Sequence, residues 1–241
     1  MKKHFVWMVA FLMAGFQAAA QDDDFNFINF TSKNGLSSNS VHAILKDRFG
    51  YMWFASEDGL NKFDGVNFTV YRHNNNDTTS IGAGTVTALK EDSVGNLWVG
   101  AGNTLSLYDR KKNSFLNFVL PAGVIRSLCI DHKGNMWIGT YTGLYILEKK
   151  SRRLRKYAFN HDKNNLLKVD AVVIVFEDSR NRIWIGTNSG LYRSSASCDF
   201  FKRFVPDKNN PASFPDMTTR AIVEDFHGNI WFGTVDNGIC R

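Results

Sequence analysis

The segment Val172–Leu191, VVIVFEDSRNRIWIGTNSGL, sets the pattern of this chain because four other segments repeat it. The five copies fall into register when their tryptophans are aligned: Trp53, Trp98, Trp137, Trp184 and Trp231. An aspartate stands six residues before each tryptophan: Asp47, Asp92, Asp131, Asp178 and Asp225. Successive tryptophans are 45, 39, 47 and 47 residues apart. A period near 45 residues, with strand patterns bounded by turns, is typical of a β-propeller with one four-stranded blade per repeat.

The aspartates open a tight turn in every copy. Three residues before the tryptophan is a glycine in four copies and Asn181 in the other. An aspartate can accept backbone hydrogen bonds at the start of such a turn, and glycine supplies the positive φ at its end. Asparagine tolerates that conformation better than most residues. We therefore interpret the five aspartates as turn formers rather than metal ligands or catalytic acids.

The strand that carries the tryptophan is apolar on both faces. Its five versions read MWF, LWV, MWI, IWI and IWF. A sheet with one solvated face would alternate polar and apolar residues, so both faces of this strand are expected to be covered. A small residue follows two positions after the tryptophan: Ala55, Gly100, Gly139, Gly186 and Gly233. We predict that the tryptophans form a core between stacked blades and are not a platform for stacking sugars.

The remaining strands of each blade follow from the same register. In the first repeat we predict strands at residues 41–46 and 51–55, and a third strand that begins at Leu60. Aromatic segments supply the fourth strands: residues 67–71, 115–120, 154–159 and 200–205. The segment FNFINF at residues 25–30 also has a strand pattern, and it could provide an outer strand. The fifth repeat reaches Arg241 at the start of its third strand, so we expect an incomplete ring. It is either an unusual five-bladed ring or, as we favour, the front part of a longer propeller.

The first 20 residues have the features of a signal peptide. Lys2 and Lys3 precede an apolar run from Phe5 to Phe16, and Ala18–Ala20 fits a small-residue cleavage pattern. The alternative is a membrane anchor, but the run is shorter than the roughly 20 residues that span a bilayer. We therefore predict an exported protein in which residues 21–241 form the propeller domain, with no membrane span after cleavage.

The net charge of +6 includes a basic cluster of six residues within Lys149–Lys156. The cluster could attract an anionic polysaccharide or a membrane surface. We favour a solvated hairpin between two strands. Export argues against nucleic acid as a partner, in spite of the basic charge.

The three cysteines point to no cofactor. Cys129 falls within a strand, where we expect a small core residue. An odd number without short spacings indicates neither a metal site nor a disulfide framework. Cys198 and Cys240 could form a disulfide, which the sequence alone leaves open.

The repeat D-x-x-G-x-(L/M/I)-W-(I/V/F)-G-T-x-x-G-L resembles the two-component regulator propeller repeat. The stretch FINFTSKNGLSSNSVHAILKDRFGYMWFASEDGLNKFDG, residues 27–65, is similar to the usual first blade of that family. The resemblance implies the periplasmic sensor region of a hybrid two-component histidine kinase. In such receptors paired propellers and a β-sandwich recognise a glycan or its breakdown products, and a membrane helix leads to the kinase. The family has no motif that assigns ligand residues, so no binding residue is carried over.

Three functions are compatible with these features. The resemblance favours a ligand-sensing module that binds an oligosaccharide, with self-association or further sensor domains as partners. No kinase segment is recognised in these 241 residues, so we expect this chain itself not to be an enzyme. A protein-interaction scaffold is the second possibility. A propeller glycosidase or lyase is the third, with Glu57 and Asp58 as its candidate carboxylates.

Overall fold

The computed structural model describes residues 26–157, 171–195, 198 and 200–241. The signal peptide predicted at residues 1–20 lies outside these ranges. The chain forms two units, Met1–Phe30 and Thr31–Arg241. The described part contains one short 3-10 helix, η1 (Ser32–Asn34), and otherwise strands and turns.

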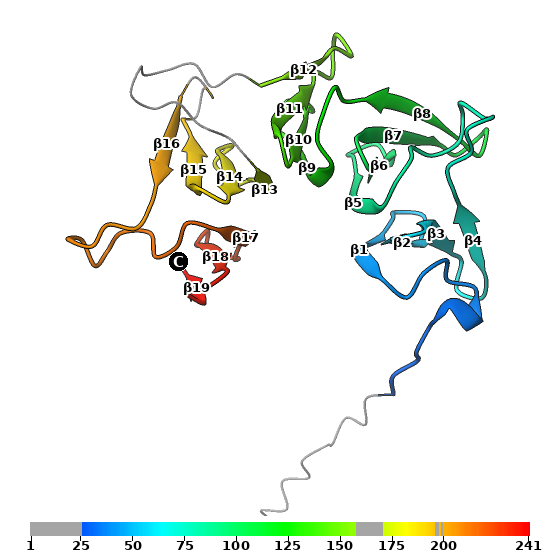
Figure 1. Ribbon diagram of the computed structural model, residues 1–241, viewed down its shortest axis with the longest axis horizontal. Helices are drawn as coiled ribbons and strands as arrows, with labels where there is room; N and C mark the ends of the chain where they lie inside the picture. The colour runs from blue at the N-terminus through cyan, green and yellow to red at the C-terminus, as the bar shows by residue number, and fades with distance from the viewer. Residues whose placement is uncertain (1–25, 158–170, 196–197, 199) are drawn as a thin grey trace, which may run out of the picture. The chain divides into compact units, whose positions relative to one another are not determined.

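The second unit consists of five antiparallel sheets, which we call blades 1 to 5 in chain order (Figure 1). The strands of blades 1 and 2 are β1 (Val41–Lys46), β2 (Met52–Ser56), β3 (Gly59–Phe63), β4 (Phe68–Tyr71), β5 (Val86–Glu91), β6 (Leu97–Ala101), β7 (Thr104–Asp109) and β8 (Ser114–Val119). Those of blades 3 to 5 are β9 (Ile125–Ile130), β10 (Met136–Thr140), β11 (Gly143–Leu147), β12 (Leu154–Lys156), β13 (Val172–Glu177), β14 (Ile183–Thr187), β15 (Gly190–Ser194), β16 (Phe201–Phe204), β17 (Thr219–Glu224), β18 (Ile230–Thr234) and β19 (Ile239–Cys240). In every blade the strands pair in chain order. The predicted all-β propeller architecture is confirmed.

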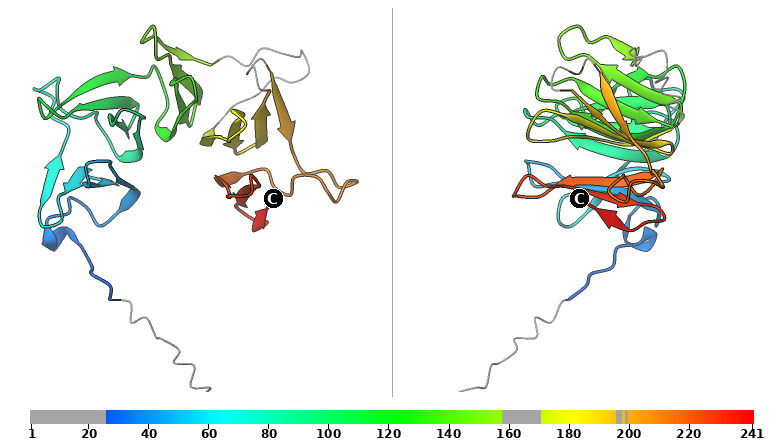
Figure 2. Two further views of the ribbon diagram at one scale, coloured as in Figure 1. Left: turned by 180° about the vertical axis from the view of Figure 1, so that it is seen from behind. Right: turned by 90° about the vertical axis from the view of Figure 1, so that its left-hand side faces the viewer.

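The first strand of each blade contacts the first strand of the next: β1 with β5, β5 with β9, β9 with β13, and β13 with β17. These strands lie on the inner side of the unit and the fourth strands on its outer side (Figure 1). The same succession of sheets is visible from behind (Figure 2, left). Blades 1 to 4 have four strands each, and blade 5 has three within the described residues.

The predicted turn chemistry is also confirmed. The glycines that end the turns have positive φ, for example 92° at Gly95 and 81° at Gly134. Asn181 takes the same place in blade 4 with a φ of 59°. The turn therefore needs a left-handed residue at this point, and asparagine can supply it.

The core of the unit lies between neighbouring blades. Trp53 and Leu60 of blade 1 pack in one buried cluster with Leu97 and Val99 of blade 2. A second cluster joins blades 2 and 3, a third joins blades 3 and 4, and a fourth joins blades 4 and 5. In blades 2 to 4 both faces of the tryptophan strand are thus covered, as its apolar sequence predicts.

In blades 2 to 4 the glycine two positions after the tryptophan allows this close packing. A Cβ on Gly139 would lie 2.7 Å from Ser127 Oγ and 2.7 Å from Val172 Cγ1, which belongs to the next blade. A Cβ on Gly100 would lie 2.6 Å from Ile125 Cγ2, also in the next blade. Glycine therefore sets the distance at which adjacent blades pack.

The strand predicted at residues 25–30 is wrong for the part that the structure describes. Asn26–Phe30 forms no strand, and Phe27 and Ile28 are 92% and 78% exposed. An alternating apolar pattern makes a strand only where a sheet edge is available to pair its backbone. Among the described residues, Asn26–Phe30 pairs with none of the five sheets.

We predict that Gly139→Ala lowers the free energy of unfolding by about 1–3 kcal/mol, because the added methyl group would force blades 3 and 4 apart. Denaturation in urea at neutral pH measures the loss.

Gly233→Ala is the matched control for this substitution. It occupies the same repeat position, but its added Cβ would meet only Ala221, at 3.3 Å and 3.9 Å. Any general effect of alanine in a strand is common to both variants. Equal losses in the two proteins would contradict the role assigned to Gly139.

Candidate functional site

Each repeat aspartate is hydrogen-bonded to the tryptophan six residues later. The distances from indole Nε1 to the aspartate Oδ2 are 2.8, 3.3, 2.9, 2.8 and 2.8 Å in blades 1 to 5. The other oxygen, Oδ1, closes the turn, as in blade 4, where it accepts from the backbone of Arg180 and Arg182. One carboxylate therefore closes the turn and orients the buried indole ring. Sequence reasoning identified the turn but missed the bond to tryptophan, although the constant spacing of six residues was a signal for it.

Asp47 and Asp178 have pKa values below their usual range. Burial alone would raise the pKa of Asp47, but hydrogen bonds from Trp53, the Arg110 guanidinium and the Tyr51 backbone outweigh it. The pKa of Asp47 is therefore below its usual value. The pKa of Asp178 is also lowered, since the bonds from Trp184 and Arg182 outweigh its burial. Carboxylates with lowered pKa values are acceptors at neutral pH and poor proton donors.

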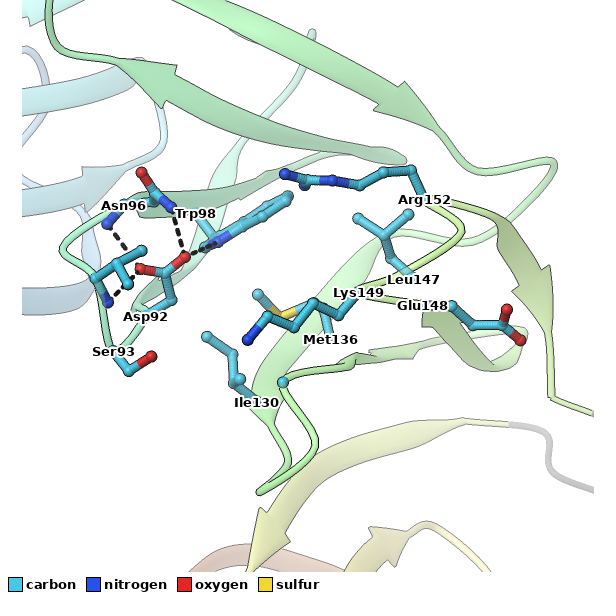
Figure 3. A pocket seen from close by; sticks show the side chains of 12 residues that line it. Asp92, Ser93, Asn96, Trp98, Ile130, Met136, Leu147, Glu148, Lys149 and Arg152 are labelled. Atoms are coloured by element: carbon cyan, nitrogen blue, oxygen red, sulfur yellow. Dashed lines mark hydrogen bonds between the residues drawn. The ribbon is translucent and has the colours of Figure 1, made fainter.

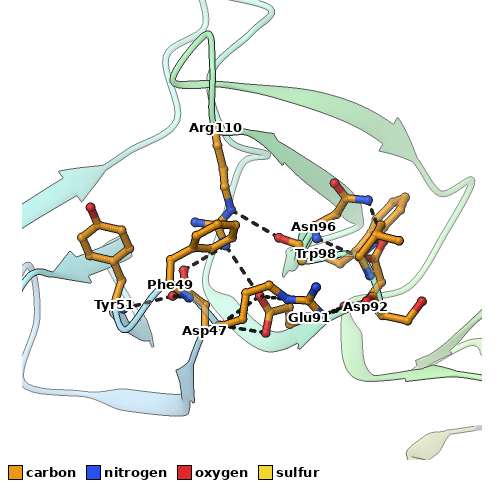
Figure 4. A network of polar contacts seen from close by, with 12 residues as sticks. Asp47, Phe49, Tyr51, Glu91, Asp92, Asn96, Trp98 and Arg110 are labelled. Atoms are coloured by element: carbon orange, nitrogen blue, oxygen red, sulfur yellow. Dashed lines mark hydrogen bonds and ion pairs between the residues drawn. The ribbon is translucent and has the colours of Figure 1, made fainter.

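In blades 2 to 5 a further donor reaches Oδ2 from the side chain four residues after the aspartate. In blades 2, 3 and 5 it is an asparagine whose Nδ2 lies 2.7, 3.0 and 2.9 Å away. In blade 4 it is Arg182, at 2.6 Å. Tyr51 occupies this position in blade 1 and gives no such bond. In blade 1 the Asp47 carboxylate instead forms an ion pair with a residue of blade 2: Arg110 Nη2 lies 2.8 Å from Asp47 Oδ2 (Figure 4).

Arg110 belongs to a polar network at the junction of blades 1 and 2 (Figure 4). Its Nε donates to the carbonyl of Gly95 at 3.2 Å, and its Nη2 lies 3.9 Å from Glu91 Oε1. Glu91 ends β5, and both of its carboxylate oxygens accept from the backbone N–H of Arg48, at 3.2 Å. The end of one blade's first strand is thus bound to the turn of the preceding blade.

The opposite ends of the tryptophan strands carry short links, and the links of blades 1, 3, 4 and 5 share one backbone hydrogen bond. A hydroxyl three residues after the tryptophan donates to the carbonyl of the glycine that ends the link, at 2.7–2.9 Å: Ser56 to Gly59, Thr140 to Gly143, Thr187 to Gly190, and Thr234 to Gly238. The next side chain in each link differs from blade to blade: Glu57, Gly102, Tyr141, Asn188 and Val235. Tyr141 is 50% exposed, with the Arg126 guanidinium 5.1 Å from its ring centre. These links present variable side chains on a fixed frame.

The two candidate catalytic carboxylates are both exposed in the first of these links. Asp58 Oδ2 accepts from Arg72 Nε and Nη2 at 3.0 and 2.9 Å. Asp58, Arg72 and Glu57 all border a cavity of about 330 Å³ between blades 1 and 2. The structure thus places Asp58 in an exposed ion pair.

The basic cluster forms the hairpin that the sequence predicts. Its strand β12 pairs with β11, and Glu148 accepts from Arg155 at 2.8 Å. All three cysteines are free thiols, so Cys198 and Cys240 form no disulfide in this structure. Burial raises the pKa of the Cys129 thiol to about 11, consistent with a core residue.

Two classes of feature are absent from the described ranges. Across residues 26–157, 171–195, 198 and 200–241, no three His, Cys, Asp or Glu side chains gather to hold a metal ion. Nor does any helix in these ranges have the length and apolar character needed to cross a membrane.

We predict that Arg110→Met lowers the free energy of unfolding by about 3–5 kcal/mol, because it leaves the fully buried Asp47 carboxylate without its charged partner. Arg72→Met is the control, since it removes an ion pair of similar length between side chains that are 54% and 59% exposed. Its cost should stay below about 1 kcal/mol. Denaturation curves of the two variants that superimpose would contradict the structural role of Arg110.

Comparisons with known proteins agree with this architecture. A family model described as the two component regulator propeller matches residues 35–58, 80–103, 119–142, 167–189 and 213–236. Each matched segment contains one of the five repeat tryptophans. A histidine kinase from Formosa agariphila, Histidine kinase P4, is 43% identical over 74 residues. That match covers 31% of this chain and 5% of the kinase, so the chain corresponds to a small part of that protein.

Solved structures share the fold at lower identity. One is described as the extracellular domain of a hybrid two component system from B. thetaiotaomicron, with a TM-score of 0.56 and 19% identity. The match covers 87% of this chain and 35% of that one. A catalytically inactive virginiamycin B lyase from Staphylococcus aureus has a TM-score of 0.64 and 17% identity, with 86% and 66% of the chains covered. At such identities the likeness shows the fold alone, whereas the five matched repeats show that this chain belongs to the two-component regulator propeller family.

Proposed function

We propose that this chain is the ligand-sensing propeller of an exported, periplasmic receptor in a hybrid two-component system. Its ligand in this proposal is a glycan or a fragment of one, and the kinase activity belongs to another part of the receptor. The observation that carries the proposal is the set of five family repeats folded as five blades. The match to a histidine kinase supports the signalling context. The resemblance to an extracellular sensor domain and the signal-like start at residues 1–20 support export.

The surface best suited to recognition is formed by the links after the tryptophan strands. In blades 1, 3, 4 and 5 the serine or threonine hydrogen bond fixes the backbone of the link, so little ordering would be needed there when a ligand binds. Their side chains vary between charged, amide, aromatic and apolar groups. Binding residues are often loop residues held by a rigid scaffold, which is the arrangement here. Tyr141 is the best single candidate because its ring is half-exposed and lies next to the charged Arg126.

The proposal is tested by isothermal titration of the purified chain with neutral and acidic oligosaccharides. We expect at least one saccharide to bind, and Tyr141→Ala to weaken that binding by about tenfold, since exposed aromatic residues are frequent anchors of binding surfaces. Phe226→Ala is the matched control. Phe226 is 92% exposed but lies in the aspartate turn, at the other end of the blade.

The outcomes separate the competing functions. Binding that Tyr141→Ala does not change would exclude this link as the recognition surface. A folded chain that binds no saccharide would contradict a glycan ligand. Shortened or unsaturated products in the titration mixture would instead show a glycosidase or lyase, and Glu57→Gln with Asp58→Asn would then identify its carboxylates.

A further inference from the structure

Three of the four blade junctions contain the same carboxylate contact. The last residue of the first strand is a glutamate in blades 2, 4 and 5, and each glutamate binds the residue after the aspartate of the preceding blade. Glu91 accepts from the backbone of Arg48, and Glu177 accepts from or pairs with His132 Nδ1 at 2.6 Å. Glu224 accepts two hydrogen bonds from Ser179. At the junction of blades 2 and 3 the equivalent residue is Ile130, which has no carboxylate.

The turn that faces Ile130 keeps the donors for that missing carboxylate. Ser179 in blade 4 gives its backbone N–H to Glu224 Oε2 at 2.7 Å and its hydroxyl to Oε1 at 2.6 Å. Ser93 has the same residue type at the same place in blade 2. Among the residues that the structure describes, neither the N–H nor the hydroxyl of Ser93 has an acceptor. Its carbonyl is bound by Arg48, at 2.8 Å. Ser93 therefore offers two donors, its N–H and its hydroxyl, to a carboxylate at the place where the other junctions have a glutamate.

A cavity of about 190 Å³ opens at this point, between Ser93, Trp98 and Ile130 (Figure 3). Lys149 extends across it toward Asp92 and Ser93, and the guanidinium of Arg152 lies 5.9 Å from the centre of the Trp98 ring. Neither Lys149 nor Arg152 forms an ion pair with any described residue. The two cations therefore border an open space with their charge unpaired.

The junction of blades 1 and 2 shows what this arrangement lacks. Leu107 of β7 is paired with Trp98 of β6, and Arg110 stands three residues after Leu107. Lys149 follows the partner of Trp137 by three residues, so it is the counterpart of Arg110 in the next blade. At the first junction two carboxylates face two guanidinium groups: Asp47, Glu91, Arg48 and Arg110.

At the second junction one carboxylate faces two cations. Asp92 is that carboxylate, and its oxygens already accept from Val94, Asn96 and Trp98. Glu148 also borders the cavity, but its carboxylate accepts from Arg155 and Ser151 and points away from the space (Figure 3). One further negative charge would restore the balance found at the first junction.

We propose that the cavity between blades 2 and 3 binds a carboxylate of a ligand, which takes the place of the glutamate at the other junctions. The carboxylate oxygens accept from the N–H and hydroxyl of Ser93, Lys149 supplies the countercharge, and Trp98 with Arg152 borders the rest of the ligand. The volume is smaller than the roughly 300 Å³ of a drug-sized pocket, so it suits one acidic residue, such as a single uronic acid ring. The choice of a uronic acid rests on the proposed glycan-sensing function, whereas the carboxylate site does not.

The test is titration of the full chain with trigalacturonate, and with malonate as a simple carboxylate. Ile130→Glu supplies the missing glutamate from within the protein, so it should weaken binding at least tenfold and raise the thermal midpoint. Lys149→Met should also weaken binding at least tenfold. Lys150→Met is the matched control, because it removes the neighbouring cation, which does not line this cavity. It should change the affinity for either compound less than twofold.

Each result supports or overturns one part of the inference. Malonate binding that Ile130→Glu abolishes, without trigalacturonate binding, would support the carboxylate site and overturn the uronic acid. Trigalacturonate bound equally by the chain and by both variants would overturn this site while leaving glycan sensing intact. A chain that binds neither compound would overturn the carboxylate site itself.

Discussion

The hydrogen bond from each tryptophan indole to the aspartate six residues earlier is the interaction on which the rest of the structure depends. It ties the turn at one edge of a blade to the ring that fills the space between blades. A hydrogen bond to a charged group contributes roughly 1.5–3 kcal/mol, and an unpaired buried carboxylate would cost more. Since the pair recurs in all five blades, the scaffold is nearly invariant. Variation is left to two places, the junctions and the links.

The sequence predicts this scaffold well because its constraints are local. The turn, the strand order and the left-handed Asn181 all follow from residues within one repeat. The junction contacts did not follow, because Glu91, Glu177 and Glu224 bind residues 43–45 positions away in another blade. Arg110 was missed for the same reason. FNFINF shows the opposite failure: its local pattern is that of a strand, but Asn26–Phe30 pairs with no sheet among the described residues.

The two variable places lie at opposite ends of the tryptophan strands. At one end the links carry different side chains on a common frame, which suits selection among ligands. At the other end a carboxylate joins adjacent blades, except where Ile130 leaves Ser93 and Lys149 facing a cavity. A ligand that supplied the carboxylate there would connect blades 2 and 3 in the manner of Glu91. Binding at this site would thus be coupled to the packing between two blades.

A double-mutant cycle on Asp131 and Trp137 tests the central claim most directly. Both side chains are buried, and their hydrogen bond is 2.9 Å long. Urea denaturation of the parent, Asp131→Ala, Trp137→Phe and the double variant gives the coupling energy between them. The interaction described here predicts a coupling of about 1–2 kcal/mol. Losses that simply add would contradict it, because the turn and the tryptophan would then stabilise the blade independently.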